Sequence, residues 1–164
     1  MKLITVVTPC FNEDQNIKQC YLEVKNIFSD IGNYCYEHIF IDNSSTDSTY
    51  ELLLDIASKD NKVKLIQNSR NFGHLRSPFY GILQSKGDAT ILFAADLQDP
   101  ANMIPKFIKE WEQGGKSIVA VKRSSGESHL MFFIRKLYYR VVNSLADIQL
   151  IDNFTGFGLY DKEV

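Results

Sequence analysis

The sequence has no apolar run of the ~18 residues that a membrane-spanning helix needs, so no segment of it is expected to cross a bilayer. The apolar stretch after Met1 is too short for a signal peptide and is typical of a first strand. Cysteine is scarce: Cys10, Cys20 and Cys35 fit no zinc-binding spacing, and their odd number argues against a disulfide framework. We therefore expect free thiols in a reducing compartment.

A basic excess is also missing. The chain carries 18 lysines and arginines against 20 aspartates and glutamates, for a net charge of -2, whereas nucleic-acid binding calls for basic residues gathered on one face. We expect no nucleic-acid partner. The 164 residues are 45% hydrophobic and 23% charged, which is typical of one soluble globular domain with a buried core.

Short apolar runs alternate with amphipathic stretches along the chain. The apolar runs predict strands at residues 3–8, 38–41, 63–66, 89–95, 117–121 and 154–160. The stretches between them predict helices at residues 13–31, after 47, and at 73–86, 99–113 and 129–145. This alternation indicates an α/β fold with a mainly parallel, Rossmann-like sheet and helices on both faces.

Capping signals set the expected ends of these helices. Asn12 is the expected N-cap of the first helix, with Gln15 in capping-box position. Asp99 and Pro100 are expected to cap and open the fourth helix. The large apolar residues of the third helix are Leu75, Phe79, Ile82 and Leu83.

Polar clusters follow the first, second and fourth strands, at Pro9–Glu13, Asp42–Asp47 and Asp96–Asp99. In an open parallel sheet the ligand binds outside the carboxyl ends of the strands, so these clusters are expected to form one site. Mg²⁺ prefers oxygen ligands and commonly takes one or two carboxylates plus substrate phosphates. Asp96 suits the carboxylate ligand and Gln98 a carbonyl ligand, whereas for Asp99 we favour a helix cap.

Further candidates lie at other strand ends. A carboxylate at Asp42 can accept hydrogen bonds from a base N–H or a ribose hydroxyl, while the residues after it, to Asp47, suit a helix cap. Arg70 suits a phosphate, and Gly73 permits close approach of an anion to a helix N-terminus; an ordinary surface loop is the alternative. Arg123 suits a pyrophosphate, with a solvated arginine as the alternative.

Taken in order, these segments resemble family-2 glycosyltransferases with the GT-A fold, most of all polyprenyl-phosphate glycosyltransferases such as dolichol-phosphate mannosyltransferase and bactoprenol glucosyltransferase. Residues 8–13 (TPCFNE) resemble P-x-Y-N-E, and residues 40–49 (FIDNSSTDST) resemble V-D-D-G-S-x-D-x-T. Residues 70–74 (RNFGH) match R-N-x-G-x, 94–100 (AADLQDP) match D-A-D-L-Q-D-P, and 152–157 (DNFTGF) resemble D-x-T-S-G-F. The resemblance covers nearly the whole chain.

The resemblance implies an inverting, metal-dependent glycosyltransferase that uses a nucleotide-sugar, with UDP favoured over GDP. Asp96 and Gln98 would hold Mg²⁺ or Mn²⁺. The implied donor-binding residues are Pro9, Glu13, Asp42, Asn71, Gly73 and Arg123. Asp152 would lie near the acceptor, and with Asp96 it is the expected catalytic residue; it is the candidate base if the acceptor is a sugar hydroxyl.

The resemblance also implies an acceptor, either a polyprenyl phosphate or a growing cell-surface glycan. The whole protein is then expected to associate with the membrane from its cytoplasmic face, in cell-envelope synthesis. The basic, aromatic helix at 129–145 suits either a core or a membrane surface. Because residues 162–164 follow a strand with no closing element, we expect the single catalytic domain to continue past residue 164.

Departures from the family pattern keep alternatives open. Ala94 stands where many relatives have the first metal aspartate, Asn43 replaces the second acid of the nucleoside motif, and Gly158 replaces an arginine. A nucleotide-sugar-binding relative without catalysis is one alternative. A nucleotidyltransferase would need a glycine-rich loop after the first strand and a phospho-receiver domain would need acids there, and Pro9–Glu13 provides neither pattern.

Overall fold

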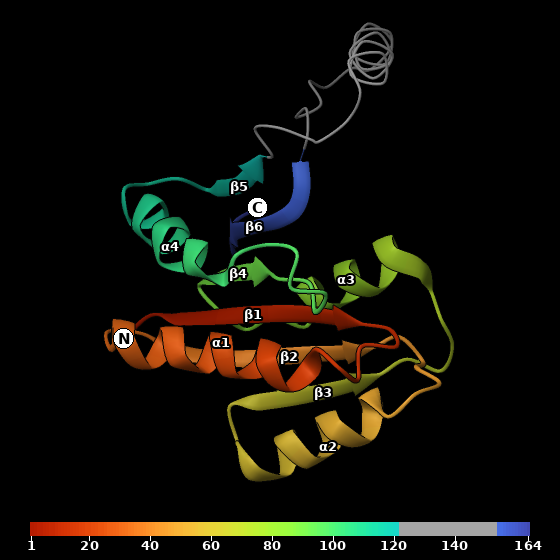
Figure 1. The fold of residues 1–164 in the computed structure, drawn as a ribbon. Helices are drawn as coiled ribbons and strands as arrows, with labels where there is room; N and C mark the ends of the chain where they lie inside the picture. Colours follow the sequence, from red (N-terminus) through yellow and green to blue (C-terminus); the bar gives the residue numbers. More distant parts are fainter. Residues whose placement is uncertain (122–153) are drawn as a thin grey trace, which may run out of the picture. The chain divides into compact units, whose positions relative to one another are not determined.

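The computed structural model describes residues 1–121 and 154–164 (Figure 1). Met1–Val119 and Gly156–Val164 form one compact unit; of the second unit, Ala120–Thr155, only residues 120, 121, 154 and 155 are described. The elements are β1 (Leu3–Cys10), α1 (Ile17–Ile31), β2 (Cys35–Asp42), α2 (Thr49–Lys59), β3 (Val63–Gln67), α3 (Gly73–Leu83), β4 (Ala89–Leu92), the 3₁₀-helix η1 (Ala101–Met103), α4 (Ile104–Glu112), β5 (Ser117–Val121) and β6 (Phe154–Asp161).

The strands form one six-stranded sheet in the order β3-β2-β1-β4-β6-β5. β1 pairs in parallel with β2 and with β4, and β2 pairs in parallel with β3. β6 runs antiparallel to β4. The predicted α/β fold with a mainly parallel sheet is therefore confirmed. β1 lies inside the sheet and is buried without a break from Ile4 to Thr8, as expected for a strand covered on both faces.

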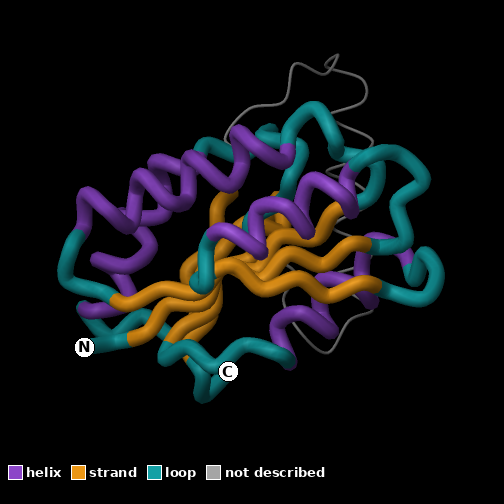
Figure 2. Tube along the Cα trace, turned by 90° about the horizontal axis from the view of Figure 1, so that it is seen from below, coloured by secondary structure: helices purple, strands orange, loops and turns teal. Residues whose placement is uncertain are grey.

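Helices cover both faces of this sheet (Figure 2). α1 contacts both α2 and α4, so these helices share one face, while α3 packs on β1, β2 and β4 from the other face. None of the described helices combines the length and the apolarity needed to span a membrane. All three cysteines are free thiols, as predicted, and burial raises the pKa of Cys20 to about 12.

Two helices begin later than predicted. α1 starts at Ile17 after Asn16, and Asn12 instead adopts a left-handed conformation with φ of 56°. The capping prediction was wrong because the Asn12 side chain accepts a hydrogen bond from Thr46 N, in the loop after β2, rather than from its own helix. Pro100 is extended and precedes η1, so α4 begins only at Ile104.

Helix α3 turns its small residues toward the sheet. The helix buries Ser77, Pro78 and Gly81 against the sheet, and it exposes three of the four large apolar residues that the sequence places on it. Small residues are required because a Cβ at Gly81 would lie 2.1 Å from Ile41 Cδ1 and 2.6 Å from Val7 Cγ1. The helix thus sits close to the sheet through its small residues.

A neutral histidine lies in the middle of the sheet. His38 is fully buried, its Nε2 lies 2.8 Å from Thr8 Oγ1, and its ring lies 3.9 Å from that of Phe40 between centroids. Among the described residues, Nδ1 has no hydrogen-bond partner. Burial penalises the charged imidazolium and lowers the pKa of His38 from 6.5 to about 3.

We expect His38 to make the protein less stable as the pH falls. Between pH 6.5 and about 3 the unfolded chain binds a proton that the folded state refuses, so the free energy of unfolding decreases by up to about 1.4 kcal/mol per pH unit. Urea unfolding of the wild type and of His38→Gln across this range measures the effect. Equal pH dependence in the two proteins would show that His38 is not neutral in the fold.

Candidate functional site

The carboxyl ends of β1, β2 and β4 lie at the same edge of the sheet because the three strands run parallel in a fixed register. Cys10 is aligned with Asp42, and Val7 with Leu92. The backbone pairing continues past the strand ends, since Asn43 N donates to Cys10 O at 2.8 Å and Phe93 N donates to Val7 O at 2.9 Å. The predicted convergence of the polar clusters at one edge is therefore observed.

The loops that follow β1 and β2 are interlocked by hydrogen bonds. Asn12 N donates to Ser45 Oγ at 3.0 Å, and Thr46 N donates to Asn12 Oδ1 at 2.8 Å. Farther along, Glu13 N donates to Thr49 Oγ1 at 2.8 Å. These hydrogen bonds hold the polar cluster after β1 against the polar cluster after β2. Each of the two loops therefore positions the other.

Pro9 lies near the end of β1, and Glu13 lies on the loop that follows this strand. Pro9 is half-buried and is aligned with Ile41 of β2. Glu13 is half-buried, and its Oε2 accepts a hydrogen bond from Asn16 Nδ2 at 2.7 Å. The structure thus places both residues at the carboxyl edge. Their contact with a nucleoside stays a prediction.

Asp42 is fully buried at the end of β2. Its two carboxylate oxygens lie 3.2 and 3.3 Å from Ser45 N, so the side chain holds the turn in which Ser44 has a positive φ of 65°. Ser48 is the N-cap of α2 and makes no capping hydrogen bond with its side chain, while Asp47 Oδ1, one residue earlier, accepts from Thr49 N at 3.0 Å. In this structure Asp42 serves the turn, and its role toward a ligand stays a prediction.

Asn43 joins the loop after β2 to the loop after β3. Its Oδ1 accepts from Asn68 Nδ2 and from Phe72 N, both at 3.0 Å. Its Nδ2 donates to Asn71 Oδ1 at 2.9 Å and to Gly73 O at 3.5 Å. A single buried amide therefore organises the segment that leads into α3. The sequence marked Asn43 only as the replacement of an acid, and this role was missed.

Asn71 and Gly73, both predicted to bind the donor, are brought together at the start of α3. Asn71 Oδ1 accepts from Gly73 N at 2.8 Å, which closes a tight turn. Gly73 has a φ of 83°, a conformation that side chains rarely adopt, so glycine is required here for the backbone. Arg70 is exposed, with its guanidinium 4.7 Å from the centroid of the Phe72 ring.

Asp96 and Gln98 lie in the loop after β4, and both are exposed. Asp96 Oδ1 accepts from Gln98 N at 3.1 Å, and Leu97 between them has a φ of 56°. A carboxylate and an amide carbonyl suit a hard divalent cation that takes its remaining ligands from phosphate and water. No cluster of three or more histidine, cysteine, aspartate or glutamate side chains suited to a metal is found among residues 1–121 and 154–164.

Arg123 and Asp152, together with the helix expected at 129–145, lie outside the described residues. Gly158, which replaces an arginine of the family pattern, lies in β6. A Cβ there would lie 2.7 Å from Ile118 O and 3.1 Å from Val119 Cγ1, so β6 needs a glycine where it meets β5. The absence of a side chain at position 158 is thus explained by close packing of the two strands.

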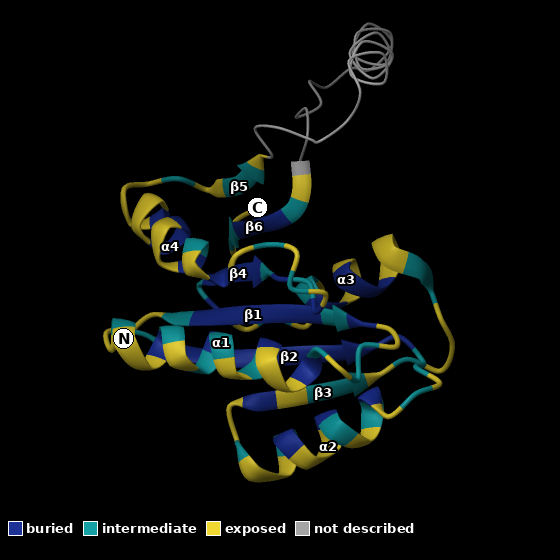
Figure 3. Cartoon of the chain, viewed as in Figure 1, coloured by how far each residue is buried: buried dark blue, intermediate teal, exposed yellow. Residues whose placement is uncertain are grey.

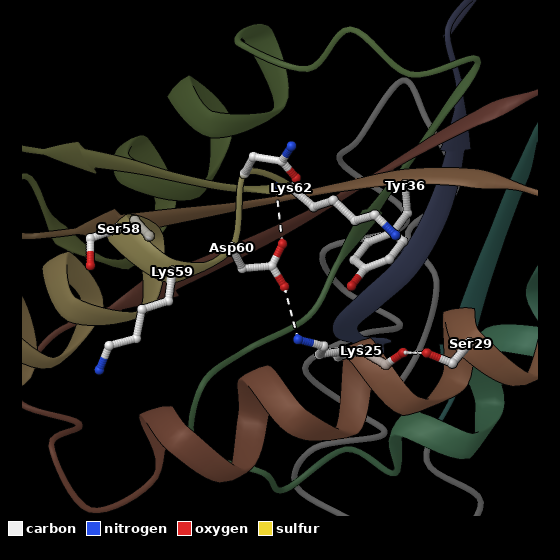
Figure 4. Close-up of a pocket in the computed structure, with 9 residues that line it drawn as sticks. Lys25, Ser29, Tyr36, Ser58, Lys59, Asp60 and Lys62 are labelled. Atoms are coloured by element: carbon white, nitrogen blue, oxygen red, sulfur yellow. Dashed lines mark hydrogen bonds and ion pairs between the residues drawn. The ribbon is translucent and has the colours of Figure 1, made fainter.

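A polar crevice of about 580 Å³ lies away from this edge, where α1 and α2 end and β3 begins (Figure 4). Asp60 holds it together: its Oδ2 accepts from Tyr21 Oη at 2.8 Å and from Lys25 Nζ at 3.1 Å, and its Oδ1 accepts from Lys62 N. The hydrogen bonds to Tyr21 and Asp60 raise the pKa of Lys25. These bonds tie α1 to the turn before β3, and we interpret the crevice as structural.

Comparison with known proteins identifies the family. The profile described as Glycosyl transferase family 2 matches residues 5–164. The chain belongs to glycosyl transferase family 2. The bactoprenol glucosyl transferase of Shigella phage SfX is 33% identical over 163 residues, which are 98% of this chain and 53% of that protein. The chain thus spans about half the length of the curated relatives it matches.

Solved structures confirm the GT-A fold that the family implies. The mannosyltransferase PcManGT from Pyrobaculum calidifontis, in complex with GDP-Man and Mn²⁺, has a TM-score of 0.61 at 17% identity, over 98% of this chain and 44% of that one. TarS 1-349 from S. aureus, in complex with UDP-GlcNAc, has a TM-score of 0.57 at 18% identity, over 98% of this chain and 45% of that one. At these identities the likeness concerns the fold alone.

We expect Asn43→Ala to destabilise the family-2 chain and to weaken nucleotide binding. The substitution leaves Phe72 N and Asn71 Oδ1 without their buried partner, which costs about 1–3 kcal/mol of unfolding free energy. Urea unfolding and calorimetric titration with nucleotide measure the two effects. Asn61→Ala, at an exposed turn before β3, should change the unfolding free energy by less than about 0.5 kcal/mol. Equal stability of the two variants would contradict the role of Asn43.

Proposed function

We propose that this chain is the donor-binding part of an inverting glycosyltransferase that transfers a sugar from a nucleotide-sugar to an acceptor. The observation that carries the proposal is the carboxyl edge of the sheet, where hydrogen bonds of Asn12 and Asn43 interlock the loops after β1, β2 and β3, and where the loop after β4 carries Asp96. Such an edge is where open α/β sheets bind their ligands. Membership of family 2 supports sugar transfer as the reaction.

The nucleoside is proposed to bind between the loops after β1 and β2, near Pro9, Glu13 and Asp42. The diphosphate is proposed to lie toward Asn71 and Gly73, where the N-terminus of α3 offers backbone N–H groups to an anion. Arg123 is the proposed further contact to phosphate. We propose UDP as the nucleotide, and UDP-GlcNAc and GDP-Man in the structures of TarS and PcManGT define the two nucleotides to compare.

Asp96 and Gln98 are the residues proposed to hold Mg²⁺ or Mn²⁺. Their exposure at the carboxyl edge and their oxygen donors support this assignment. When bound, the cation would offset negative charge on the diphosphate leaving group. Asp96 carries the carboxylate share of the ligation alone, because Ala94 stands where relatives have another aspartate. The Mn²⁺ in the PcManGT complex supports a divalent cation in this fold.

The proposed reaction is a single in-line displacement at the anomeric carbon. A bond forms between the acceptor oxygen and the anomeric carbon, and the bond from that carbon to the diphosphate oxygen breaks. The nucleoside diphosphate leaves with the bonding electron pair, and the configuration of the sugar inverts. Within this scheme, Asn71, Gly73 and Arg123 would hold the diphosphate in position while the acceptor attacks from the opposite side.

We propose a polyprenyl phosphate as the acceptor, with a growing glycan as the alternative. The name of the phage relative, bactoprenol glucosyl transferase, supports a lipid-linked acceptor. A phosphate monoester has a second pKa of about 6 and is largely ionised near neutral pH, so its attack needs no protein base. A lipid acceptor would also require the whole protein to work at the cytoplasmic face of a cell membrane in envelope synthesis.

Nucleotide titration tests the donor site directly. We expect UDP to bind in the presence of Mn²⁺ more tightly than GDP, and chelation of the metal to weaken binding. Asp96→Ala should reduce the metal-dependent affinity by about tenfold or more, because it removes the only carboxylate in the proposed ligand set. Isothermal calorimetry of wild type and variant provides the measurement.

Asp30→Ala is the matched control for this titration, because Asp30 is exposed at the far end of α1. It should bind nucleotide like the wild type. Tighter binding of GDP would redirect the donor assignment to GDP-sugars. If the folded protein bound neither nucleotide, or if Asp96→Ala kept the full metal dependence, the proposed donor site would be refuted.

The two acceptors are separated by Asp152→Asn. With a polyprenyl phosphate as acceptor, we expect this variant to retain nearly full activity, because the attacking phosphate is already ionised. With a sugar hydroxyl as acceptor, loss of a general base should lower the rate by about 10²–10⁴-fold. Transfer of radiolabelled sugar to each acceptor measures the difference, and a comparable loss with the lipid phosphate would refute the base-free mechanism.

A further inference from the structure

Helix α3 exposes most of its large apolar residues. Figure 3 shows exposed stretches along this helix. Leu75 is 73% exposed, Phe79 61%, Leu83 63% and Tyr80 46%. Residues four apart on a helix lie one above the other, so Leu75, Phe79 and Leu83 form one stripe, with Arg76 and Tyr80 beside it. We call these five residues the α3 outer face.

The other described helices do not share this feature. The only large apolar side chains that they strongly expose are Leu22 of α1 and Leu54 of α2. Single exposed apolar residues are common on soluble proteins, whereas a contiguous group marks an interaction surface. The packing of α3 on the sheet does not require the group either, because that packing uses Ser77, Pro78 and Gly81.

The charged side chains of the segment that contains α3 are all basic. From Asn68 to Gly87 the sequence contains no aspartate or glutamate, although acidic residues outnumber basic ones in the chain as a whole. The same segment contains Arg70, Arg76 and Lys86. The α3 outer face thus combines an apolar stripe with neighbouring cations, and its segment has no carboxylates. Such a face complements a surface that has negative charge at its outer level and apolar groups beneath.

We propose that the α3 outer face docks on an anionic lipid surface. With 11 residues, α3 is about 16 Å long, which suits a helix that lies in the plane of the interface rather than across it. The leucines and Phe79 enter the boundary between headgroups and acyl chains. Tyr80 keeps its hydroxyl at the polar level, and Arg76 contacts lipid phosphates.

This docking would also bring a lipid acceptor close to the donor site. That consequence rests on the proposed function. α3 begins at Gly73, next to Asn71 and the amide of Asn43. A membrane bound along α3 would therefore lie beside the candidate donor site. A polyprenyl phosphate, whose reactive phosphate lies at headgroup level, would then meet the donor without leaving the bilayer.

Vesicle flotation of the 164-residue chain tests the proposal. We expect the wild type to float with phosphatidylcholine vesicles that contain phosphatidylglycerol, and to do so less in high salt or without the anionic lipid. The double variant Leu75→Ser/Phe79→Ser should partition at least about tenfold more weakly, because the residues that enter the boundary are lost. Arg76→Glu should weaken binding to the anionic vesicles alone.

The matched control is Leu22→Ser/Leu54→Ser, which removes two exposed leucines from α1 and α2. It should float like the wild type. Equal loss in both double variants, or no flotation of the folded wild type with anionic vesicles, would overturn the proposal. So would a wild-type dimer that Leu75→Ser/Phe79→Ser converts to monomer without any vesicle binding, since the surface would then bind a second copy of the chain.

Nucleotide titration of the same proteins separates this proposal from the proposed function. All targeted side chains are exposed, so we expect the Leu75→Ser/Phe79→Ser variant to unfold at the wild-type urea concentration and to bind nucleotide like the wild type. Loss of flotation with retained nucleotide binding supports the lipid-binding surface. Flotation of a wild type that binds no nucleotide would support the surface and refute the donor site.

Discussion

The parallel register of β1, β2 and β4 is the constraint on which the rest of this structure depends. Pairing of Cys10 with Asp42 places the two strand ends at the same level, and the backbone ladder continues beyond them from Asn43 N to Cys10 O and from Asn68 N to Asp42 O, both at 2.8 Å. Each loop therefore starts from a fixed point. A slip of one residue would exchange the two faces of a strand and would separate the loops that now interlock.

The sequence predicted the sheet well because its strands stand out as apolar runs between amphipathic stretches, and because β1 and β2 are buried almost without a break. It did not predict which side of α3 packs on the sheet, and the reason is physical. Periodicity shows which residues share a helix face, but the surface beneath the helix decides which face fits. Over α3 that surface holds Ile41 and Val7 so close that a Cβ at Gly81 would clash with both. Small residues therefore pack inward and large ones face solvent.

The candidate site was predictable in location and less so in detail. Acidic residues that directly follow buried strands must lie at the carboxyl edge, so the positions of Asp42 and Asp96 followed from topology alone. The partners of the neighbouring amides did not follow, because an asparagine can cap a helix or bond to another loop with similar energy. Asn12 bonds to Thr46 across the loops, and only the folded arrangement of both loops decides between these outcomes.

Asn43 shows how the departure from the family pattern fits this arrangement. Its amide faces acceptors as well as donors: it receives hydrogen bonds from Asn68 and Phe72, and it donates to Asn71 Oδ1 and Gly73 O. An ionised carboxylate at this position would accept hydrogen bonds but donate none. Its oxygen would then face Asn71 Oδ1 and Gly73 O without a hydrogen between them. The neutral amide also keeps a negative charge away from the start of α3, where a diphosphate would bind, so one residue both holds the loop and avoids repelling the proposed ligand.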